Sequence, residues 1–138
     1  MGGFVLDCSI AVAWCFEDEA GPDTDALLER VRDEGAVVPV LWHLELGNVL
    51  LQAERRGRMG AADLTARLEL IGDLPIATDD ETAARARREI LALARAEALT
   101  TYDAAYLELA MRRGLALATK DRALRSAAGR AGVILLPG

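Results

Sequence analysis

The sequence has little with which to bind zinc or cross a membrane. It contains one histidine, His43, and two cysteines, Cys8 and Cys15, with no Cys-x-x-Cys pair. This argues against a zinc site, and both thiols are expected to be reduced and buried. No apolar run approaches the ~20 residues of a membrane-spanning helix, and no basic region precedes the first apolar stretch. We therefore expect neither a membrane span nor a secretory signal, and a cytoplasmic location.

The chain is also short of positive charge, with 16 basic against 22 acidic residues and a net charge of −6. It lacks the positive field that drives most nucleic-acid affinity, which argues against tight, non-specific duplex binding. A nuclease is not excluded, because metal ions and a local basic rim can offset a cluster of carboxylates. With 52% hydrophobic and 28% charged residues, the composition is that of a soluble globular protein. Without repeats or linkers, residues 1–138 are predicted to form one domain.

The segment Phe4-Val5-Leu6-Asp7-Cys8-Ser9 is the first informative one, because three apolar residues run directly into a carboxylate. We predict a buried strand, with Ser9 as the N-cap of a helix that begins at Ile10. Asp7 then lies at the carboxyl end of a strand, the edge where α/β sheets bind ligands. A buried carboxylate there needs a partner or a metal, although Asp7 could instead cap the turn.

The remaining chain alternates short apolar strands with helices, which predicts an α/β fold: a parallel sheet of four to five strands wrapped by helices. Pro75 places one weak strand at the edge of the sheet. The further strands are predicted at residues 36–39, 74–77, 115–119 and 132–136. The helices are predicted at residues 10–17, 22–34, 40–56, 61–71, from Asp79 or Asp80 to 97, from Thr100 or Thr101 to 113, and 122–128.

Three further acids lie at the starts of predicted helices. Glu45 stands in an apolar stretch, Asp103 follows the threonine caps, and Asp121 follows a strand as Asp7 does. Each has a simpler explanation: Glu45 could lie on a polar stripe or favour the helix dipole, Asp103 could favour the dipole of its helix, and Asp121 could cap a helix. Together with Asp7 they form an oxygen-rich set that suits Mg²⁺ or Mn²⁺. Two such ions about 3.5–4 Å apart can support phosphodiester hydrolysis.

With these positions in place, the chain resembles a PIN domain, specifically a toxin of the VapC type. Four segments spread over nearly the whole chain carry the resemblance: Phe4-Val5-Leu6-Asp7-Cys8-Ser9, Val38-Pro39 with Glu45-Leu46-Gly47-Asn48, Tyr102-Asp103-Ala104-Ala105-Tyr106-Leu107-Glu108-Leu109-Ala110, and Ala118-Thr119-Lys120-Asp121. The fourth acid is the most variable in the family, which makes Asp121 the least certain of the set.

The resemblance implies a Mg²⁺- or Mn²⁺-dependent endoribonuclease toxin that is held inactive by a VapB-like antitoxin and forms a homodimer. The residues that it assigns to catalysis and metal binding are Asp7, Glu45, Asp103 and Asp121, and the polar residues that it places around the site are Ser9, Asn48 and Thr119. Two alternatives are a phosphoacceptor signalling domain, which leaves Glu45 and Asp103 unexplained, and a catalytically silent PIN-like binding module. A haloacid-dehalogenase-like phosphatase needs Asp-x-Asp, and position 9 is serine.

Other residues receive structural interpretations. His43 and Glu45 are two positions apart on a helix and do not share a face, which argues against a shared metal. Trp14 and Trp42 are expected in the core, with a dimer or antitoxin contact as alternatives. Two basic groups remain: Arg55, Arg56 and Arg58, expected to complement a helix C-terminus or to contact phosphates, and Arg85, Arg87 and Arg88, expected on a solvated helix face.

Overall fold

The computed structural model describes residues 3–138, so the first two residues of the predicted domain lie outside it. The strands are β1 (Phe4–Leu6), β2 (Ala36–Pro39), β3 (Ile76–Asp79), β4 (Leu117–Ala118) and β5 (Leu135–Leu136). The helices are α1 (Cys8–Cys15), α2 (Pro22–Glu34), α3 (Leu41–Arg55), α4 (Ala61–Gly72), α5 (Thr82–Arg85), the π-helical turn η1 (Ala86–Ile90), α6 (Leu91–Glu97), α7 (Thr101–Arg113) and α8 (Arg122–Arg130).

The five strands form one parallel sheet in the order β3-β2-β1-β4-β5. The chain runs outward from β1 through β2 to β3, and then returns to the other side of β1 for β4 and β5. This reversal makes the gap between β1 and β4 a topological switch point, where α/β sheets bind ligands at the carboxyl ends of their strands. Asp7 follows β1 and Asp121 follows β4, so the fold brings both to this point.

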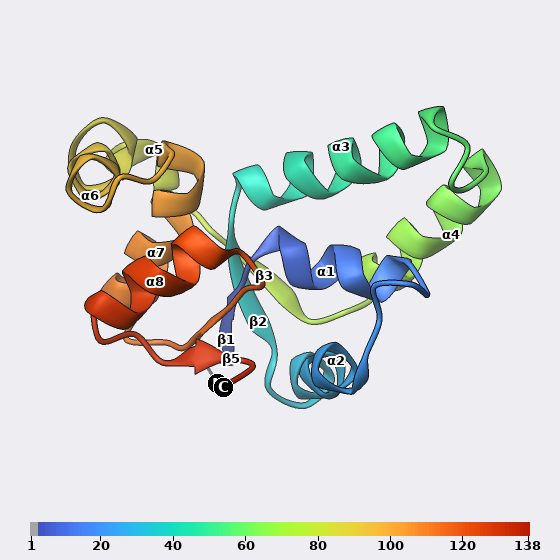
Figure 1. Cartoon of the computed structure of the whole chain (residues 1–138), viewed down its shortest axis with the longest axis horizontal. Coiled ribbons are helices and arrows are strands. Elements are labelled where there is room, and N and C mark those ends of the chain that lie inside the picture. The colour runs from blue at the N-terminus through green and yellow to red at the C-terminus, as the bar shows by residue number, and fades with distance from the viewer. Residues whose placement is uncertain (1–2) are drawn as a thin grey trace.

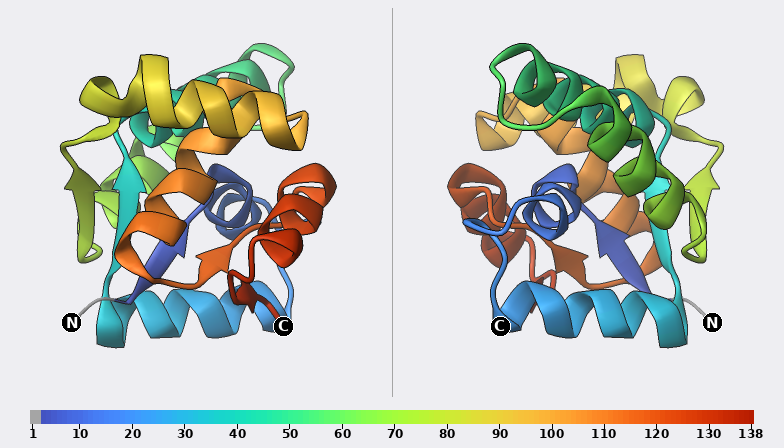
Figure 2. Two further views of the ribbon diagram at one scale, coloured as in Figure 1. Left: turned by 90° about the vertical axis from the view of Figure 1, so that its left-hand side faces the viewer. Right: turned by 90° about the vertical axis from the view of Figure 1, so that its right-hand side faces the viewer.

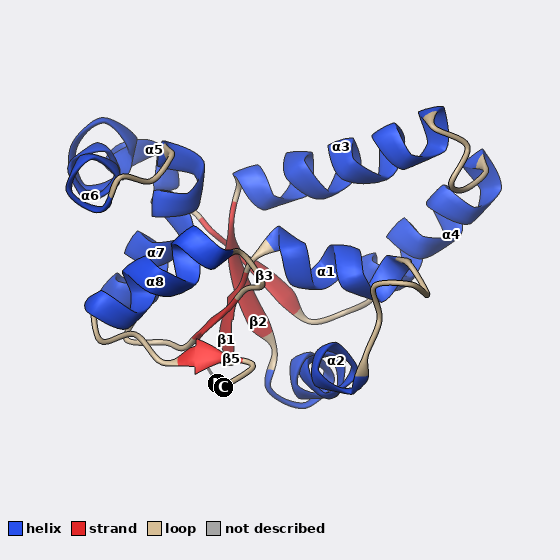
Figure 3. Cartoon of the chain, in the orientation of Figure 1, coloured by secondary structure: helices blue, strands red, loops and turns tan. Residues whose placement is uncertain are grey.

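Helices cover both faces of the sheet, which gives three layers (Figure 1, Figure 3). Helices α1 to α4 lie on one face, and α5 to α8 with η1 lie on the other; the two side views show each set in front of the sheet (Figure 2). The expected α/β/α architecture with four to five parallel strands is therefore confirmed. In the described part of the chain, no helix combines the length and apolar character needed to cross a bilayer.

The strand β1 contains no polar residue before Asp7 because it lies in the core. Phe4, Val5 and Leu6 are all fully buried, because helices cover both faces of a parallel strand. The entry to this strand is tight as well. Gly3 has φ +48°, and a Cβ on it would lie 1.8 Å from the carbonyl oxygen of Gly35. The first strand is thus fixed at both ends, by a backbone contact at Gly3 and by the site at Asp7.

Local signals predicted most helix ends. Pro22 begins α2 and Gly35 ends it, Thr100 caps α7 through a bond from the Asp103 backbone N–H (3.1 Å), and Gly114 ends that helix. The helix expected to start at Asp79 or Asp80 was placed too early, because helical turns begin at Thr82 and pass through η1. The Asp79 carboxylate bonds the Glu81 backbone N–H (3.2 Å) and side chains of α7 instead.

Candidate active site

Asp7 is held at the switch point by two hydroxyl groups. Ser9 Oγ donates to Asp7 Oδ2 at 2.6 Å and Thr119 Oγ1 donates to the same oxygen at 2.7 Å, while no side chain of the described residues donates to Oδ1. The prediction that Ser9 caps a helix from Ile10 was wrong: α1 begins at Cys8, and Asp7 occupies the N-cap position without a side-chain cap bond. The alternative that Asp7 caps the turn is also wrong, since its carboxylate is used elsewhere.

The direction of these bonds follows from the backbone around them. The Lys120 backbone N–H donates to Ser9 Oγ at 2.9 Å, and the Asp121 backbone N–H donates to Thr119 Oγ1 at 3.0 Å. Each hydroxyl therefore accepts from the loop after β4 and donates its own proton to Asp7. Burial raises the pKa of the Asp7 carboxyl, and the two hydroxyl bonds oppose that rise.

Glu45 lies on α3 and is fixed by α7. The hydroxyl of Tyr106, which is fully buried, donates a hydrogen bond to Glu45 Oε1. Burial raises the pKa of Glu45, the charges on Asp7 and Asp103 raise it further, and the Tyr106 bond lowers it. Glu45 is half-buried and bonded, so it does not belong to a solvated polar stripe. The sequence contained Tyr106 in the matching segment but gave no signal of this contact.

The last two acids come from the starts of two helices. Asp103 lies in the first turn of α7, and its pKa is raised to about 6, first by burial and then by the charges on Asp121 and Asp7. Asp121 is the N-cap of α8, where Oδ2 accepts from the Leu124 backbone N–H at 2.9 Å. The capping role considered for Asp121 is therefore real, and the same residue also faces the site.

All four acids line one open cavity of about 450 Å³. Lys120 is the one cationic side chain on its wall among the described residues, and Glu19, a further acid there, pairs with Arg58 at 3.5 Å. The complete lining is Asp7, Cys8, Ser9, Val12, Glu19, Glu45, Val49, Asp103, Lys120 and Asp121. The mutual repulsion that raises the pKa of Glu45 and Asp103 would be relieved by a bound cation.

The donor set fits a hard divalent cation. Carboxylate oxygens suit Mg²⁺ and Mn²⁺, and no side chain of the described residues bonds Asp7 Oδ1. Among residues 3–138, no three of the cavity acids bring ligand oxygens within 4.8 Å of one another. In this arrangement, an ion would take at most two carboxylates directly and complete its shell with water, as Mg²⁺ commonly does.

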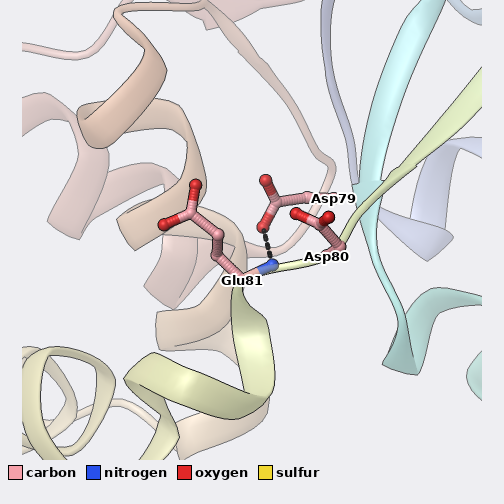
Figure 4. Close-up of side chains that lie close together, drawn as sticks. All are labelled: Asp79, Asp80 and Glu81. Atoms are coloured by element: carbon pink, nitrogen blue, oxygen red, sulfur yellow. Dashed lines mark hydrogen bonds between the residues drawn. The ribbon is translucent and has the colours of Figure 1, made fainter.

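A second acidic cluster lies elsewhere, at the end of β3 (Figure 4). Asp79, Asp80 and Glu81 do bring oxygens within 4.8 Å of one another. Arg112 already occupies this group, with Nη2 bonded to Asp79 Oδ2 at 2.8 Å and Nη1 bonded to Glu81 Oε2 at 3.3 Å. The guanidinium holds the pKa of Asp79 below its usual range, so we interpret this cluster as an ion-pair network rather than a metal centre.

The three polar residues expected around the site have different positions. Ser9 lines the cavity, Thr119 is fully buried behind Asp7, and Asn48 is exposed on α3 and is not among the lining residues. His43 bonds the Thr78 hydroxyl at 2.8 Å, away from the cavity. As expected, Cys8 is a free, buried thiol, and burial raises its pKa to about 12.

The structure also tests the interpretations of the other residues. Trp42 is buried, and Trp14 packs against the core and donates to the Thr24 carbonyl (2.8 Å). In the second basic group, Arg87 and Arg88 are exposed as expected, whereas Arg85 is half-buried and bonds Glu81 and Glu89 (3.0 and 2.9 Å). In the first group, Arg55 and Arg56 are exposed at the end of α3, whereas Arg58 pairs with Asp18 (3.1 Å) and lies over the Phe16 ring (4.1 Å).

Comparisons with known proteins agree with this architecture. The family model of the PIN domain matches residues 4–130. The crystal structure of PAE2754 from Pyrobaculum aerophilum is 26% identical, with a TM-score of 0.72 over 98% of this chain and 92% of that one. The structure of FitAcB from Neisseria gonorrhoeae is 16% identical, with a TM-score of 0.67 over 99% and 96%, a likeness in fold alone. No curated protein matches the sequence.

Proposed function

The chain belongs to the PIN-domain family, whose members are generally metal-dependent nucleases, and from this premise we propose that it is an endoribonuclease dependent on Mg²⁺ or Mn²⁺. One observation carries the proposal. Four acids that are far apart in sequence, Asp7, Glu45, Asp103 and Asp121, line one cavity at the switch point of the sheet. We assign these residues to metal binding and catalysis within a single domain of residues 1–138. These residues would hold the ion, which would supply activation of a water molecule and stabilisation of the leaving oxygen.

The chain's own residues have separate tasks in this proposal. Ser9 and Thr119 orient Asp7 so that one carboxylate oxygen remains for the ion. Tyr106 orients Glu45, and the start of α7 carries Asp103 into the cavity. A phosphoacceptor domain would use one aspartate and a lysine, and it would leave the convergence of Glu45 and Asp103 without a purpose.

The test combines binding with activity. Asp7→Asn and Asp103→Asn each remove a charge and keep the shape, so we expect folded proteins with weakened Mn²⁺ binding and no RNA cleavage. Asp80→Asn is the matched control, because it removes an exposed aspartate of the other acidic cluster. If it lowers Mn²⁺ affinity as much as Asp7→Asn does, the metal centre has been assigned to the wrong cluster. RNA cleavage that survives both substitutions would reject the assignment of catalysis to this cavity, and a folded, Mn²⁺-loaded parent that cleaves no RNA would reject the proposed activity.

The resemblance to VapC-type toxins supports a more specific role. We propose that the enzyme is the toxin of a toxin-antitoxin pair, acts as a homodimer, and is inhibited by a small antitoxin with an apolar segment followed by a basic tail. An arginine of that tail could bond two carboxylates of the cavity, which would exclude both metal and RNA. Expression of the parent should arrest growth, and co-expression of the partner encoded beside it should restore growth.

The tail itself can be tested by substitution. Replacing its arginines by alanine should reduce inhibition more than complex formation, because apolar contacts would still hold the two proteins together. Inhibition that persists after every basic residue of the tail has been removed would mean that the antitoxin blocks the enzyme by another route.

A further inference from the structure

Lys120 is the only lysine in the sequence; every other basic side chain is an arginine, apart from His43. This single lysine lies on the wall of the carboxylate cavity, next to Asp121. Its place in the fold is therefore the same switch point that gathers the four acids.

The backbone of Lys120 is fixed, and its side chain is free. Its N–H donates to Ser9 Oγ at 2.9 Å, Thr119 before it is fully buried, and Asp121 after it caps α8. Lys120 itself is exposed. The flexible four-carbon stem thus extends from a rigid point that is hydrogen-bonded to the same serine that holds Asp7.

Within the described residues, the ammonium group of Lys120 forms no ion pair with the surrounding acids. No carboxylate of the described residues lies within 4.0 Å of it, whereas each ion pair found there involves an arginine. Asp7, Glu45, Asp103 and Asp121 likewise have no basic partner within that distance in this part of the chain. A polyanionic substrate that enters this cavity meets one positive side chain among the described lining residues, besides any bound ion.

We propose that Lys120 binds a phosphate of the RNA chain at the rim of the cavity, an inference that rests on the proposed ribonuclease function. The ammonium is a compact point charge that can follow a phosphate as the chain moves, unlike the planar guanidinium. Because a contact to a phosphate carries no sequence information, it contributes affinity and register rather than sequence specificity.

Kinetics of the metal-loaded protein test the contact. Lys120→Met keeps the length of the side chain and removes its charge, so we expect KM for single-stranded RNA to rise about tenfold at low salt, with a smaller change in kcat. The slope of log affinity against log salt should become shallower by about 0.7, the value for one phosphate contact on a single strand. Lys120→Arg should restore KM to within about threefold of the parent.

Mn²⁺ binding distinguishes the role of Lys120 from that of the acids, because the two kinds of substitution should affect Mn²⁺ affinity differently. Removing a positive charge beside the carboxylates should leave Mn²⁺ affinity unchanged or tighten it, whereas the carboxylate substitutions weaken it. Arg88→Met, which removes an exposed charge on η1, should change neither KM nor the salt slope. The proposal is overturned if Lys120→Met leaves KM and the salt slope as they are, or if the loss of RNA affinity is matched by an equal loss of Mn²⁺ affinity.

Binding is measured apart from cleavage, so that the two proposals can fail separately. In an Asp103→Asn background, Lys120→Met should weaken RNA binding about tenfold. A parent protein that binds RNA through Lys120 without cleaving it would reject the ribonuclease activity and keep the phosphate contact. If substitution of Lys120 changes neither RNA cleavage nor RNA binding, the phosphate contact is rejected and the proposed ribonuclease activity stands.

Discussion

Tyr106 donates a hydrogen bond to Glu45 across 61 positions of sequence, from the centre of α7 to the second turn of α3. The tyrosine is fully buried, and burial together with the Glu45 charge raises its pKa, so it remains a protonated donor. One carboxylate oxygen of Glu45 is committed to this bond. The contact joins the two faces of the sheet at the cavity and sets the direction in which Glu45 points.

Tyr106→Phe should therefore affect the metal site more than the fold. The ring still fills the core, so the free energy of unfolding should fall by only about 1 kcal/mol, the usual worth of one hydrogen bond. Mn²⁺ affinity should fall about tenfold, because partners that orient a metal ligand have effects of that size. Calorimetric titration measures this change. Tyr102→Phe is the matched control at an exposed tyrosine, and an equal effect there would contradict the positioning role.

The pH dependence of stability should be unusual for an acidic protein. The folded-state pKa of Asp103 is about 6, above its ordinary value of 3.8, so the folded state binds this proton more tightly than the unfolded state does. The metal-free protein should therefore gain stability as pH falls from 7 towards 4, and Asp7 and Glu45 act in the same direction. Thermal melts at low ionic strength measure the trend.

Bound Mn²⁺ should reverse this trend, because protons compete with the metal for the same oxygens. The stabilisation that saturating Mn²⁺ gives at pH 7 should shrink by pH 5. Asp103→Asn should flatten the response of the metal-free protein between pH 4 and 6. A melting temperature of the metal-free parent that falls steadily over this range would contradict the assignment of charge repulsion to the cavity.

Arg112→Met should destabilise the fold without removing the active site. The guanidinium bonds Asp79 at 2.8 Å and Glu108 at 2.9 Å, and both acids are buried. The substitution leaves buried Asp79 without its basic partner and leaves Glu108 with only the longer contact to Arg85 at 3.6 Å, which should cost about 3 kcal/mol of unfolding free energy, measured in urea. Arg130→Met, at an exposed ion pair, should cost under about 1 kcal/mol. RNA cleavage at low temperature should survive in both variants, and its loss with Arg112→Met alone would implicate the network in the site.

Leu70→Glu tests where the proposed antitoxin binds. Leu70 is 69% exposed and lines a mainly apolar pocket of about 140 Å³ whose other lining residues are Trp14, Cys15, Leu28, Ile71 and Leu74 together with Arg32 and Arg67. A carboxylate at this position should weaken the complex at least tenfold and leave RNA cleavage unchanged, because an apolar partner segment would have to bury the new charge. Ile134→Glu is the control at a similarly exposed apolar residue beside β5. If Leu70→Glu leaves the affinity of the complex unchanged, the partner binds to another surface.

The sequence predicted those parts of the fold whose signals are local. The strand at Ala36–Pro39 and the cap at Thr100 depend on neighbouring residues, and the structure has both where they were expected. Pro75 correctly indicated an edge strand, although β3 covers Ile76–Asp79 and so begins two residues later than the predicted strand at 74–77. The start of α1 was misplaced because the Ser9 hydroxyl bonds Asp7 and not a helical N–H. That choice depends on Thr119, which is distant in sequence.

In the candidate site, too, the local features could be predicted from the sequence and the contacts between distant segments could not. Spacing and resemblance selected the four acids that line the cavity, since each stands at a strand end or a helix start. The bond from Tyr106 could not be predicted, because a tyrosine one turn after Asp103 is equally compatible with an ordinary core position. The half-burial of Arg85 was not predicted for a similar reason: its partner Glu81 is local, but its 3.6 Å contact with Glu108 brings it against α7.

The tight contact between Gly3 and Gly35 has a consequence for mutational scanning. The first residues of a chain usually tolerate almost any substitution, but a side chain at position 3 would collide with the Gly35 carbonyl. β1 is only three residues long, so a displacement at its start would be passed on to Asp7. If the chain is the proposed toxin, a selection for survivors of its expression should enrich changes at codon 3 together with changes at the four acids, although Gly3 has no chemical role.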